Sequence, residues 1–339
     1  MHRLLLRALL FIPLLPMISS LLSAGEAYYT GFENFTVGDD KIVGTDSWVG
    51  SYAGNKMTAV QSEAQHGVVG IGNAAFLGGF ATTITKINGS NSVYVRRPVP
   101  LDPVALGQEV ATFSVIFGIK DSTTTKRDNF EFLIYNQSNA LLGGVQMDNT
   151  TLDSTTGKPR RLIYRLGWNS ATSAFQYVLT SFNFLPETLE TLQFRINFRT
   201  NLWTASLSDV PIFQDIPFYT GTATKNFGSV MVKMAVTNTT TNTILPGDNY
   251  LIFDDYTVRT DALSTVLEIN KTATGAAKLD WNEEAGYAYQ ALWSADCQTW
   301  YSDLAGSGHT AALTQSASFT DPTAVIPQKR FYRIRRTSP

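Results

Sequence analysis

Cysteine is almost absent from this chain, and charged residues are scarce. One cysteine stands among 339 residues, and Lys, Arg, Asp and Glu make up 16% of the sequence, against about 25% in an average soluble protein. A single cysteine excludes an intrachain disulfide, a cysteine-based zinc cage and an iron–sulfur cluster. A chain of this length buries enough surface to fold without such cross-links, so we expect Cys297 to be a small buried hydrophobic residue.

The formal net charge of −2 is also close to zero. It gives the chain no general attraction to phosphate backbones or to anionic membranes. We therefore do not expect nucleic acid as a partner.

The N-terminus has the parts of a secretory signal peptide. Basic residues precede an apolar run over residues 8–22, and the small-residue string SAGEA follows. This order predicts export, with residues 1–27 as the signal segment and a protein that is secreted or held at the cell surface. The run is interrupted by Pro13 and Pro16 and is shorter than the ~20 residues of a bilayer span, which argues against a retained anchor. No later stretch resembles a membrane span.

Beyond this segment, polar and apolar residues alternate over stretches of five to ten residues. In RLIYRL, Leu162, Tyr164 and Leu166 share one side, and the residues between them take the other. A period of two predicts strands, and the aromatic residues, 12% of the chain, suit half-buried pleated surfaces. Turn residues recur at short intervals, which favours antiparallel connections. The same period occurs at 113–119, 130–134, 175–179 and 194–198. We predict an all-β protein, built as a large antiparallel jelly-roll β-sandwich and a small C-terminal β-sandwich.

A change of composition near Thr260 predicts a domain boundary. YLIFDDYTVR before it is typical of a strand, whereas DALSTVLEINKTATG after it is polar and rich in small residues. We assign residues 28–260 to the large sandwich and residues 261–339 to a linker and the small C-terminal module. Both have ordinary domain sizes.

Both parts resemble families of exported bacterial proteins. GFENFTVGD, GTDSWVG, the strand pair FRTNLWTASLSDVPIF and the closing IFDDYTV resemble concanavalin A-like, laminin-G-like jelly-roll domains. LDW at 279–281, YAYQALWSADCQTW, AGSG, SFTDP and RFYRIRR resemble the short C-terminal β-modules of secreted proteins from planctomycete- and verrucomicrobium-type bacteria. The first resemblance implies a jelly-roll fold. The second implies a fibronectin-like sandwich, which we expect to serve export or attachment to the cell surface.

Catalytic motifs are missing. The chain contains no P-loop, no Rossmann fingerprint and no zinc motif. It also lacks E-x-D-x-x-E, the string that sets two carboxylates on one strand face in jelly-roll glucan hydrolases, and the R-x-E-L-R and Q-I-H strings of jelly-roll lyases. The pair Asp128 and Glu131 has the wrong spacing, and His66 and His309 read as turn and loop residues. We therefore expect no enzyme activity, with an unrecognised polysaccharide hydrolase or lyase as the weaker alternative.

A carboxylate pair suggests a structural calcium site. Asp254 falls on the apolar face of YLIFDDYTV by parity, and Glu33 shares the face of Phe35 and Val37 in GFENFTV. First and last strands often pair in closed sandwiches, so we expect these carboxylates to approach each other. Two buried anions need compensation, which Ca²⁺ with oxygen ligands would supply, and the jelly-roll resemblance implies such an ion at this end. The alternative is that Asp254 accepts backbone N–H groups in a bulge while Asp255 faces water.

Basic residues follow the polar faces of strands that we expect to be neighbours. In a chain with few charges, this concentration suggests a surface for an acidic polysaccharide, because guanidinium groups match the geometry of carboxylate and sulfate. The alternative is the ordinary polar exterior of a sandwich. The candidates are Arg161, Arg165, Arg195, Asn197 and Arg199, with Lys233 further along.

Aromatic residues near turns are candidate platforms for sugar rings. Trp48 and Tyr52 in TDSWVGSYAG and Trp168 in GWNS are the candidates. The alternative for each is burial, which is the usual state of large rings. Trp203 shares a face with Ala205 and Leu207, so we expect it in the core. Trp281, Trp293 and Trp300 are expected to build the core of the small module.

These observations predict a secreted, non-catalytic β-sandwich protein that binds carbohydrate. The second hypothesis is a structural or adhesion protein of an extracellular matrix or surface layer.

Overall fold

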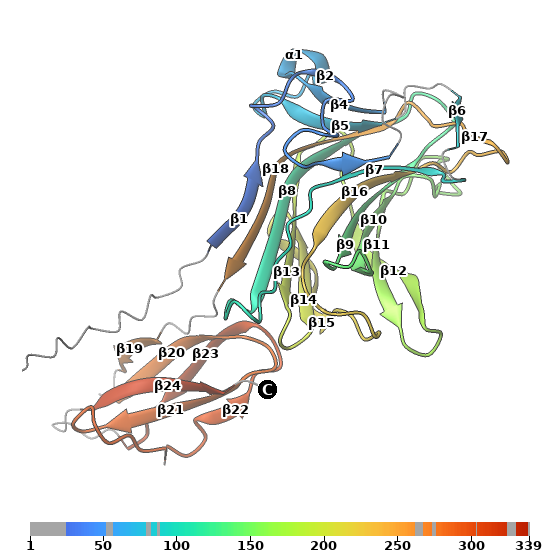
Figure 1. Cartoon of the computed structure of the whole chain (residues 1–339). Coiled ribbons are helices and arrows are strands. Elements are labelled where there is room, and N and C mark those ends of the chain that lie inside the picture. The colour runs from blue at the N-terminus through green and yellow to red at the C-terminus, as the bar shows by residue number, and fades with distance from the viewer. Residues whose placement is uncertain are drawn as a thin grey trace, which may run out of the picture.

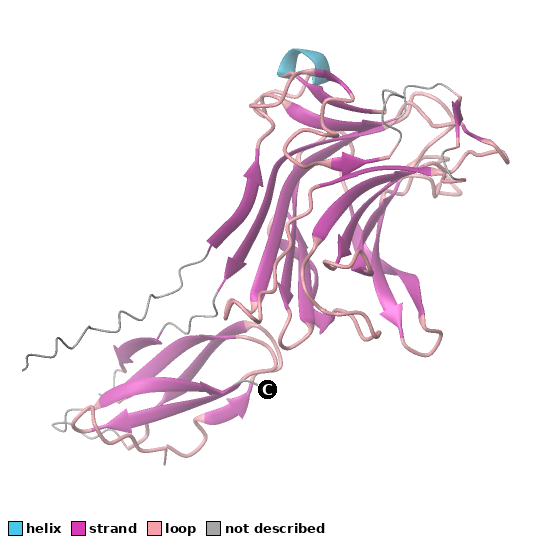
Figure 2. Ribbon diagram, viewed as in Figure 1, coloured by secondary structure: helices cyan, strands magenta, loops and turns pink. Residues whose placement is uncertain are grey.

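The computed structural model describes residues 25–51, 57–78, 83–86, 89–261, 267–272, 276–302, 304–323 and 330–337. Strands dominate these residues, and the helix among them, α1 (Glu63–His66), has four residues (Figure 2). The all-β prediction is confirmed. The described part of the chain has no helix of the length and apolar character needed to cross a bilayer. Most of the expected signal segment, residues 1–24, lies outside the described residues.

Two large antiparallel sheets form a sandwich (Figure 1). The nine-stranded sheet has a main path of eight strands, and β1 (Gly25–Thr30) pairs with β18 off that path. The pairing of Thr30 with Tyr256 confirms that the first and last strands of the domain meet. In spatial order the main path is β15 (Val210–Pro217), β14 (Leu202–Leu207), β13 (Glu190–Asn197), β8 (Val110–Lys120), β18 (Tyr250–Asp261), β5 (Ala74–Gly78), β4 (Thr58–Gln61) and β2 (Gly38–Asp39).

The second large sheet has seven strands and carries the candidate site. In spatial order it consists of β12 (Ala174–Asn183), β11 (Leu162–Asn169), β10 (Leu141–Asp148), β9 (Asn129–Tyr135), β16 (Ser229–Ala235), β7 (Ser92–Arg96) and β3 (Val49–Gly50). A separate short pair joins β6 (Ile84–Thr85) to β17 (Thr243–Ile244).

Alternating side chains fill the space between the two sheets. Phe113 and Phe117 on β8 and Phe130 and Phe132 on β9 are buried in one continuous cluster. The rings of Phe117 and Phe132 meet across the two sheets at 5.5 Å. Full burial of one such side chain contributes about 1.5–3 kcal/mol. The same cluster contains Trp203, which confirms that prediction.

Strand β18 changes the face that it presents to the core at Asp254 and Asp255. Leu251 and Phe253 point into the core before this position, and Tyr256 does so after it. Asp255 has a φ of 49°, and the pairing with β8 shifts register here. The predicted apolar face of YLIFDDYTV assumed unbroken alternation, so it is wrong for the first half of the strand.

The C-terminal strands form two sheets of three strands each. In Figure 1 they lie at the end of the sandwich opposite α1. Trp281, Tyr287 and Tyr289 form a small core there, against which Trp293 packs. Cys297 is exposed with a φ of 60°, so its predicted burial is wrong. The strands are β19 (Leu267–Lys271), β20 (Ala277–Glu283) and β23 (Gln315–Thr320) in one sheet, and β22 (Gly308–Thr310), β21 (Ala288–Ser294) and β24 (Phe331–Thr337) in the other.

Candidate functional site

The outer face of the seven-stranded sheet, which points away from the nine-stranded sheet, carries a row of polar side chains. Cross-strand register sets this row, because directly paired residues point to the same side of a sheet. The residues on the opposite side of the same strands, such as Phe132 and Val145, lie in the main core. From β7 to β11 the row is Tyr94, Lys233, Glu131, Gln146 and Tyr164.

Glu131 is the centre of this row and accepts hydrogen bonds from three side chains. The Nζ of Lys233 lies 2.8 Å from Oε2. The Nε2 of Gln146 donates to Oε1 at 3.2 Å, and the hydroxyl of Tyr177 donates to the same oxygen at 3.0 Å. Glu131 is only 2% exposed. A carboxylate buried to this degree needs such partners, because burial without them is costly.

Tyr177 reaches Glu131 across the sheet. It lies on β12, three strand positions from β9, which corresponds to about 14 Å on a flat sheet. The hydrogen bond shows that the two side chains lean toward each other over β10 and β11. Burial, together with the nearby Glu131 carboxylate, raises the pKa of Tyr177 above its usual value. Tyr177 therefore stays a neutral hydroxyl, and it is still 48% exposed.

Apolar and aromatic side chains surround the polar centre, which we define as Glu131, Gln146, Tyr177 and Lys233. Leu133, Leu166 and Met231 form a small buried cluster on this face. It packs under partly exposed neighbours, so the face combines a fixed polar centre with ring surfaces. These neighbours are Tyr94, Tyr135, Leu141 and Phe175.

The predicted basic residues on β13 do not form a free surface. Arg195 makes two hydrogen bonds of 2.7 Å to the carboxylate of Glu284, and Asn197 donates to Glu284 at 3.1 Å. Arg199 binds Glu109 at 2.5 Å. Glu284 follows β20, so the hydrogen bonds of Arg195 and Asn197 join the C-terminal strands to the sandwich. The acidic partner of Arg195 and Asn197 lies among the C-terminal strands, and Arg199 is paired within the sandwich. Strand parity reveals neither partner, and the prediction of a free glycan surface at these residues is wrong.

The two arginines near β11 differ from each other. Arg161 forms an ion pair of 2.6 Å with Asp121, so its guanidinium group already has an anionic partner. Arg165 pairs with Val145 and Val178 and therefore shares a side with core residues, not with Glu131. It has no hydrogen bond or ion pair within the described residues, and burial lowers its pKa. The two arginines therefore do not form the predicted continuous basic stripe.

The three predicted sugar platforms have different outcomes. Trp48 is 1% exposed and packs on Phe32, Phe253 and Tyr256, so it is a core residue and not a platform. Tyr52 lies outside the described residues. Trp168 is partly buried, pairs with Phe175 across β11 and β12, and packs against the main core, where its ring also contacts Tyr219.

Asp254 and Glu33 are near each other, but only Asp254 is buried. Glu33 lies in an exposed turn, not on the expected strand face, and accepts the backbone N–H of Asn73 at 3.0 Å. The Oδ1 of Asp254 is buried without a partner. Burial, with smaller effects from Asp255 and Glu33, raises the pKa of Asp254 to about 7. Among the described residues, no group of three or more His, Cys, Asp or Glu side chains is arranged to hold a metal ion, so the structure shows no calcium ligand set and calcium binding stays a prediction.

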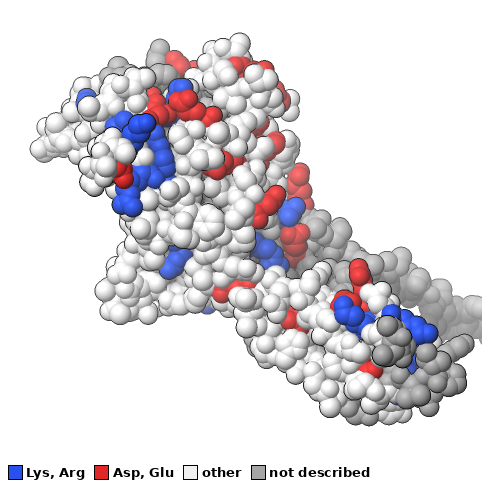
Figure 3. All heavy atoms as spheres, turned by 180° about the vertical axis from the view of Figure 1, so that it is seen from behind, with Lys and Arg blue, Asp and Glu red and all other residues white. Residues whose placement is uncertain are grey.

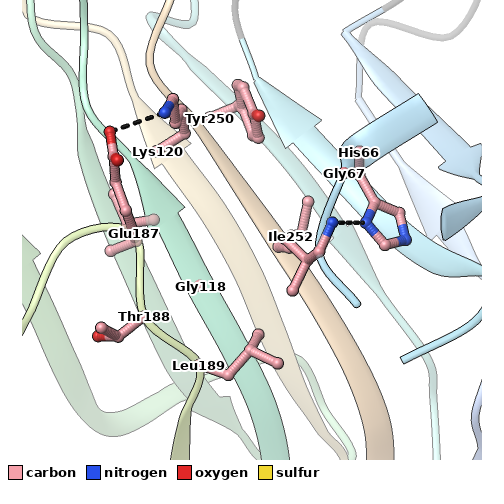
Figure 4. A pocket seen from close by; sticks show the side chains of 11 residues that line it. His66, Gly67, Gly118, Lys120, Glu187, Thr188, Leu189, Tyr250 and Ile252 are labelled. Atoms are coloured by element: carbon pink, nitrogen blue, oxygen red, sulfur yellow. Dashed lines mark hydrogen bonds and ion pairs between the residues drawn. The ribbon is translucent and has the colours of Figure 1, made fainter. Parts of the chain in front are cut away.

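A separate pocket of about 240 Å³ lies on the outside of the nine-stranded sheet (Figure 4). Gly118 and Ile252 form part of its lining, and Lys120 and Glu187 form an ion pair of 2.8 Å on one side. On the other side, the Nε2 of His66 contacts the carbonyl oxygen of Gly72 at 2.9 Å, and Nδ1 accepts the N–H of Val68. The polar groups on both sides thus already have partners, which makes this pocket the weaker candidate.

Charged side chains are unevenly distributed over the surface. Figure 3 shows one face on which most atoms belong to uncharged residues, with a gathered group of Lys and Arg on the large domain. Uncharged contacts therefore dominate what this face of the protein offers to a partner.

Sequence reasoning missed the polar centre. Glu131 stands between two phenylalanines in NFEFLIY, and this lone charge inside an apolar strand is a signal that could have indicated it. The partner Tyr177 stands 46 residues away from Glu131, so only the sheet order brings them together.

No family model and no curated protein matches the chain. Solved structures that it resembles include a carbohydrate esterase from a Shiga toxin-encoding bacteriophage, at 14% identity and a TM-score of 0.41, covering 70% of this chain and 100% of that one. A GH131 beta-glucanase catalytic domain from Podospora anserina matches at 12% identity and a TM-score of 0.41, covering 71% and 98%. The carbohydrate recognition domain of Emp46p matches at 9% identity and a TM-score of 0.40, covering 71% and 100%. Similarity at this level concerns the β-sandwich fold alone.

Proposed function

We propose that the protein binds carbohydrate, without converting it, through the outer face of the seven-stranded sheet. The observation that carries the proposal is Glu131, held by Lys233, Gln146 and Tyr177 on the face of the seven-stranded sheet that points away from the nine-stranded sheet. Small-molecule sites combine apolar and aromatic surface with a few fixed polar groups. This face has that composition.

The chemistry of a sugar ring fits such a face. Its C–H surface lies well on aromatic rings, and Tyr94, Tyr135, Phe175 and Tyr177 offer rings around the polar centre. Its hydroxyl groups both donate and accept hydrogen bonds. Lys233 and Gln146 have further donors and acceptors beyond the bonds that they make to Glu131.

The arrangement supports binding over catalysis. Glycoside hydrolysis needs two carboxylates on either side of the scissile bond, whereas both oxygens of Glu131 are already hydrogen-bonded. Asp148 lies two residues after Gln146 on β10 and is therefore on the same face as a possible second carboxylate. It already accepts hydrogen bonds from the hydroxyl groups of Thr150 and Thr151 in the turn that follows. A base for a lyase reaction works best with a pKa near the working pH, whereas the pKa of Tyr177 is raised further above that pH by burial.

We further propose that the protein is secreted or held at the cell surface, with the C-terminal strands as the part that attaches it. The N-terminal sequence supports export. The second candidate, a structural or adhesion protein, is favoured by the polar contacts that fix the C-terminal strands on the sandwich, because they would transmit load between the two parts.

A glycan array followed by calorimetric titration tests the proposal. We expect at least one polysaccharide or oligosaccharide ligand, no new product after long incubation, and a loss of affinity in Tyr177→Ala. Tyr301→Ala is a matched control, because Tyr301 is 45% exposed but lies in the C-terminal domain. Binding to no glycan, or equal effects of both variants, would overturn the proposal. Cleavage of the ligand would show an enzyme.

A further inference from the structure

We propose that Arg96 forms a subsite for an anionic group, so that the glycan bound by this face carries carboxylate or sulfate. This inference rests on the proposed function, because it concerns the same face. Arg96 lies on β7 and pairs with Met231, one row away from Lys233 and Glu131. Two residues along a strand correspond to about 7 Å, so an extended glycan on the polar centre also reaches Arg96.

The structure fixes the guanidinium of Arg96 without neutralising it. Nη1 donates to the side-chain oxygen of Asn139 at 2.8 Å, and Cζ lies 5.8 Å from the centre of the Tyr135 ring. The Nε is buried and has no partner. Neither Asn139 nor Tyr135 is an anion at neutral pH.

No carboxylate pairs with Arg96 anywhere in the described residues. In the remaining segments, the sequence contains a single acidic residue, Asp303, which belongs to the C-terminal module. The other cation on this face, Lys233, is already paired with Glu131. Arg96 therefore carries a positive charge that no ion pair within the described residues neutralises.

A partly buried guanidinium with free donors selects for carboxylate or sulfate. Its planar donors match two oxygens of such a group, and hydrogen bonds between charged partners are stronger than neutral ones. The Tyr135 ring beneath it holds the guanidinium in place, and cation–π contact of this kind is favourable. The proposed ligand is still an acidic polysaccharide, as the sequence predicts. The residue that binds its anionic group is Arg96, however, and not the arginines near β11 and β13.

The test compares charged and neutral forms of the same polysaccharide. A polyuronate and its methyl ester form one arm, and a sulfated glycan and its desulfated form make up the other, which separates carboxylate from sulfate. We expect wild type to prefer at least one charged form. We expect Arg96→Gln to lose about ten- to a hundredfold in affinity for it, with unchanged affinity for the neutral form.

Two further variants keep the result interpretable. Arg160→Gln removes the same charge from an exposed position in the loop between β10 and β11 and should retain the preference. Arg96→Lys keeps the charge without the planar fork and should show an intermediate loss. A thermal melt checks that each variant is folded.

The outcomes separate the two proposals. Equal binding of charged and neutral forms by wild type, or a preserved preference in Arg96→Gln, overturns the anionic subsite and leaves carbohydrate binding intact. No binding of any form overturns both.

Discussion

Arg195 and Glu284 form a two-pronged ion pair between the sandwich and the C-terminal strands, with both N–O distances at 2.7 Å. The side chain of Glu284 is only 7% exposed. Asn197 supports the same carboxylate, and the N–H of Thr314 donates to Asp215 at 2.7 Å nearby. These contacts give the two parts a defined junction.

Glu284→Gln should weaken this junction. Removing one partner of a buried ion pair costs about 3–5 kcal/mol, and the partial exposure of Arg195 places the expected loss at the lower end of that range. We expect calorimetry to show a separate, earlier unfolding transition for the C-terminal strands. The control is Lys278→Gln, which removes an exposed pair with Asp280 and should cost less than about 1 kcal/mol. Identical melting curves for both variants would contradict a fixed junction.

Glu131→Gln should destabilise the polar centre and weaken glycan binding. The change leaves the partly buried Lys233 without its anion, for which we expect a loss of about 1–3 kcal/mol in the free energy of unfolding. Denaturant titration measures this loss. Adding Lys233→Met should recover part of it, since the unpaired charge is then gone, and the double-mutant cycle measures the coupling. Additive effects of the two substitutions would show that the residues do not act together.

Asp254 should make the protein less stable as the pH rises. The pKa of its carboxyl group is raised to about 7 in the folded state, whereas it is about 3.9 in an unfolded chain. The folded state therefore binds more protons between these values, and stability falls from about pH 4 to pH 7. Asp254→Asn removes this dependence. Its advantage over wild type should grow between pH 5 and pH 8, by at most about 3 kcal/mol.

Added Ca²⁺ tests whether a bound cation, instead of a proton, neutralises the buried carboxylate of Asp254. If the ion binds between Asp254 and Glu33, millimolar Ca²⁺ should raise the unfolding midpoint of wild type at pH 8, because a ligand of the folded state stabilises it. Asp254→Asn should not respond. A midpoint that is indifferent to Ca²⁺ and to EGTA would exclude the calcium hypothesis.

The strands were predictable from sequence, but the side of the sheet on which some residues lie was not. Alternation placed Phe113, Phe117 and Phe194 correctly, because each of these strands has one clearly apolar face. Strand β11 is apolar on both faces, so parity did not show that Ile163 belongs to the main core while Leu166 lies with the polar centre.

Local irregularities and contacts between distant segments limited the rest of the prediction. The bulge at Asp254 and Asp255 reverses the face of β18, and nothing in the alternation of YLIFDDYTV marks it. The partners of Glu131 come from three other strands, and their approach depends on strand order, which a single sequence does not give.

Hydroxyl-radical footprinting of tyrosines, with and without a bound glycan, tests the central claim most directly. Tyr177 is 48% exposed on the proposed site, whereas Tyr29 and Tyr301 are similarly exposed elsewhere, at 51% and 45%. We predict that the glycan protects Tyr177 and leaves Tyr29 and Tyr301 as reactive as before. Protection of Tyr250 at the pocket or of Tyr301, with Tyr177 unchanged, would contradict the assignment of carbohydrate binding to the outer face of the seven-stranded sheet.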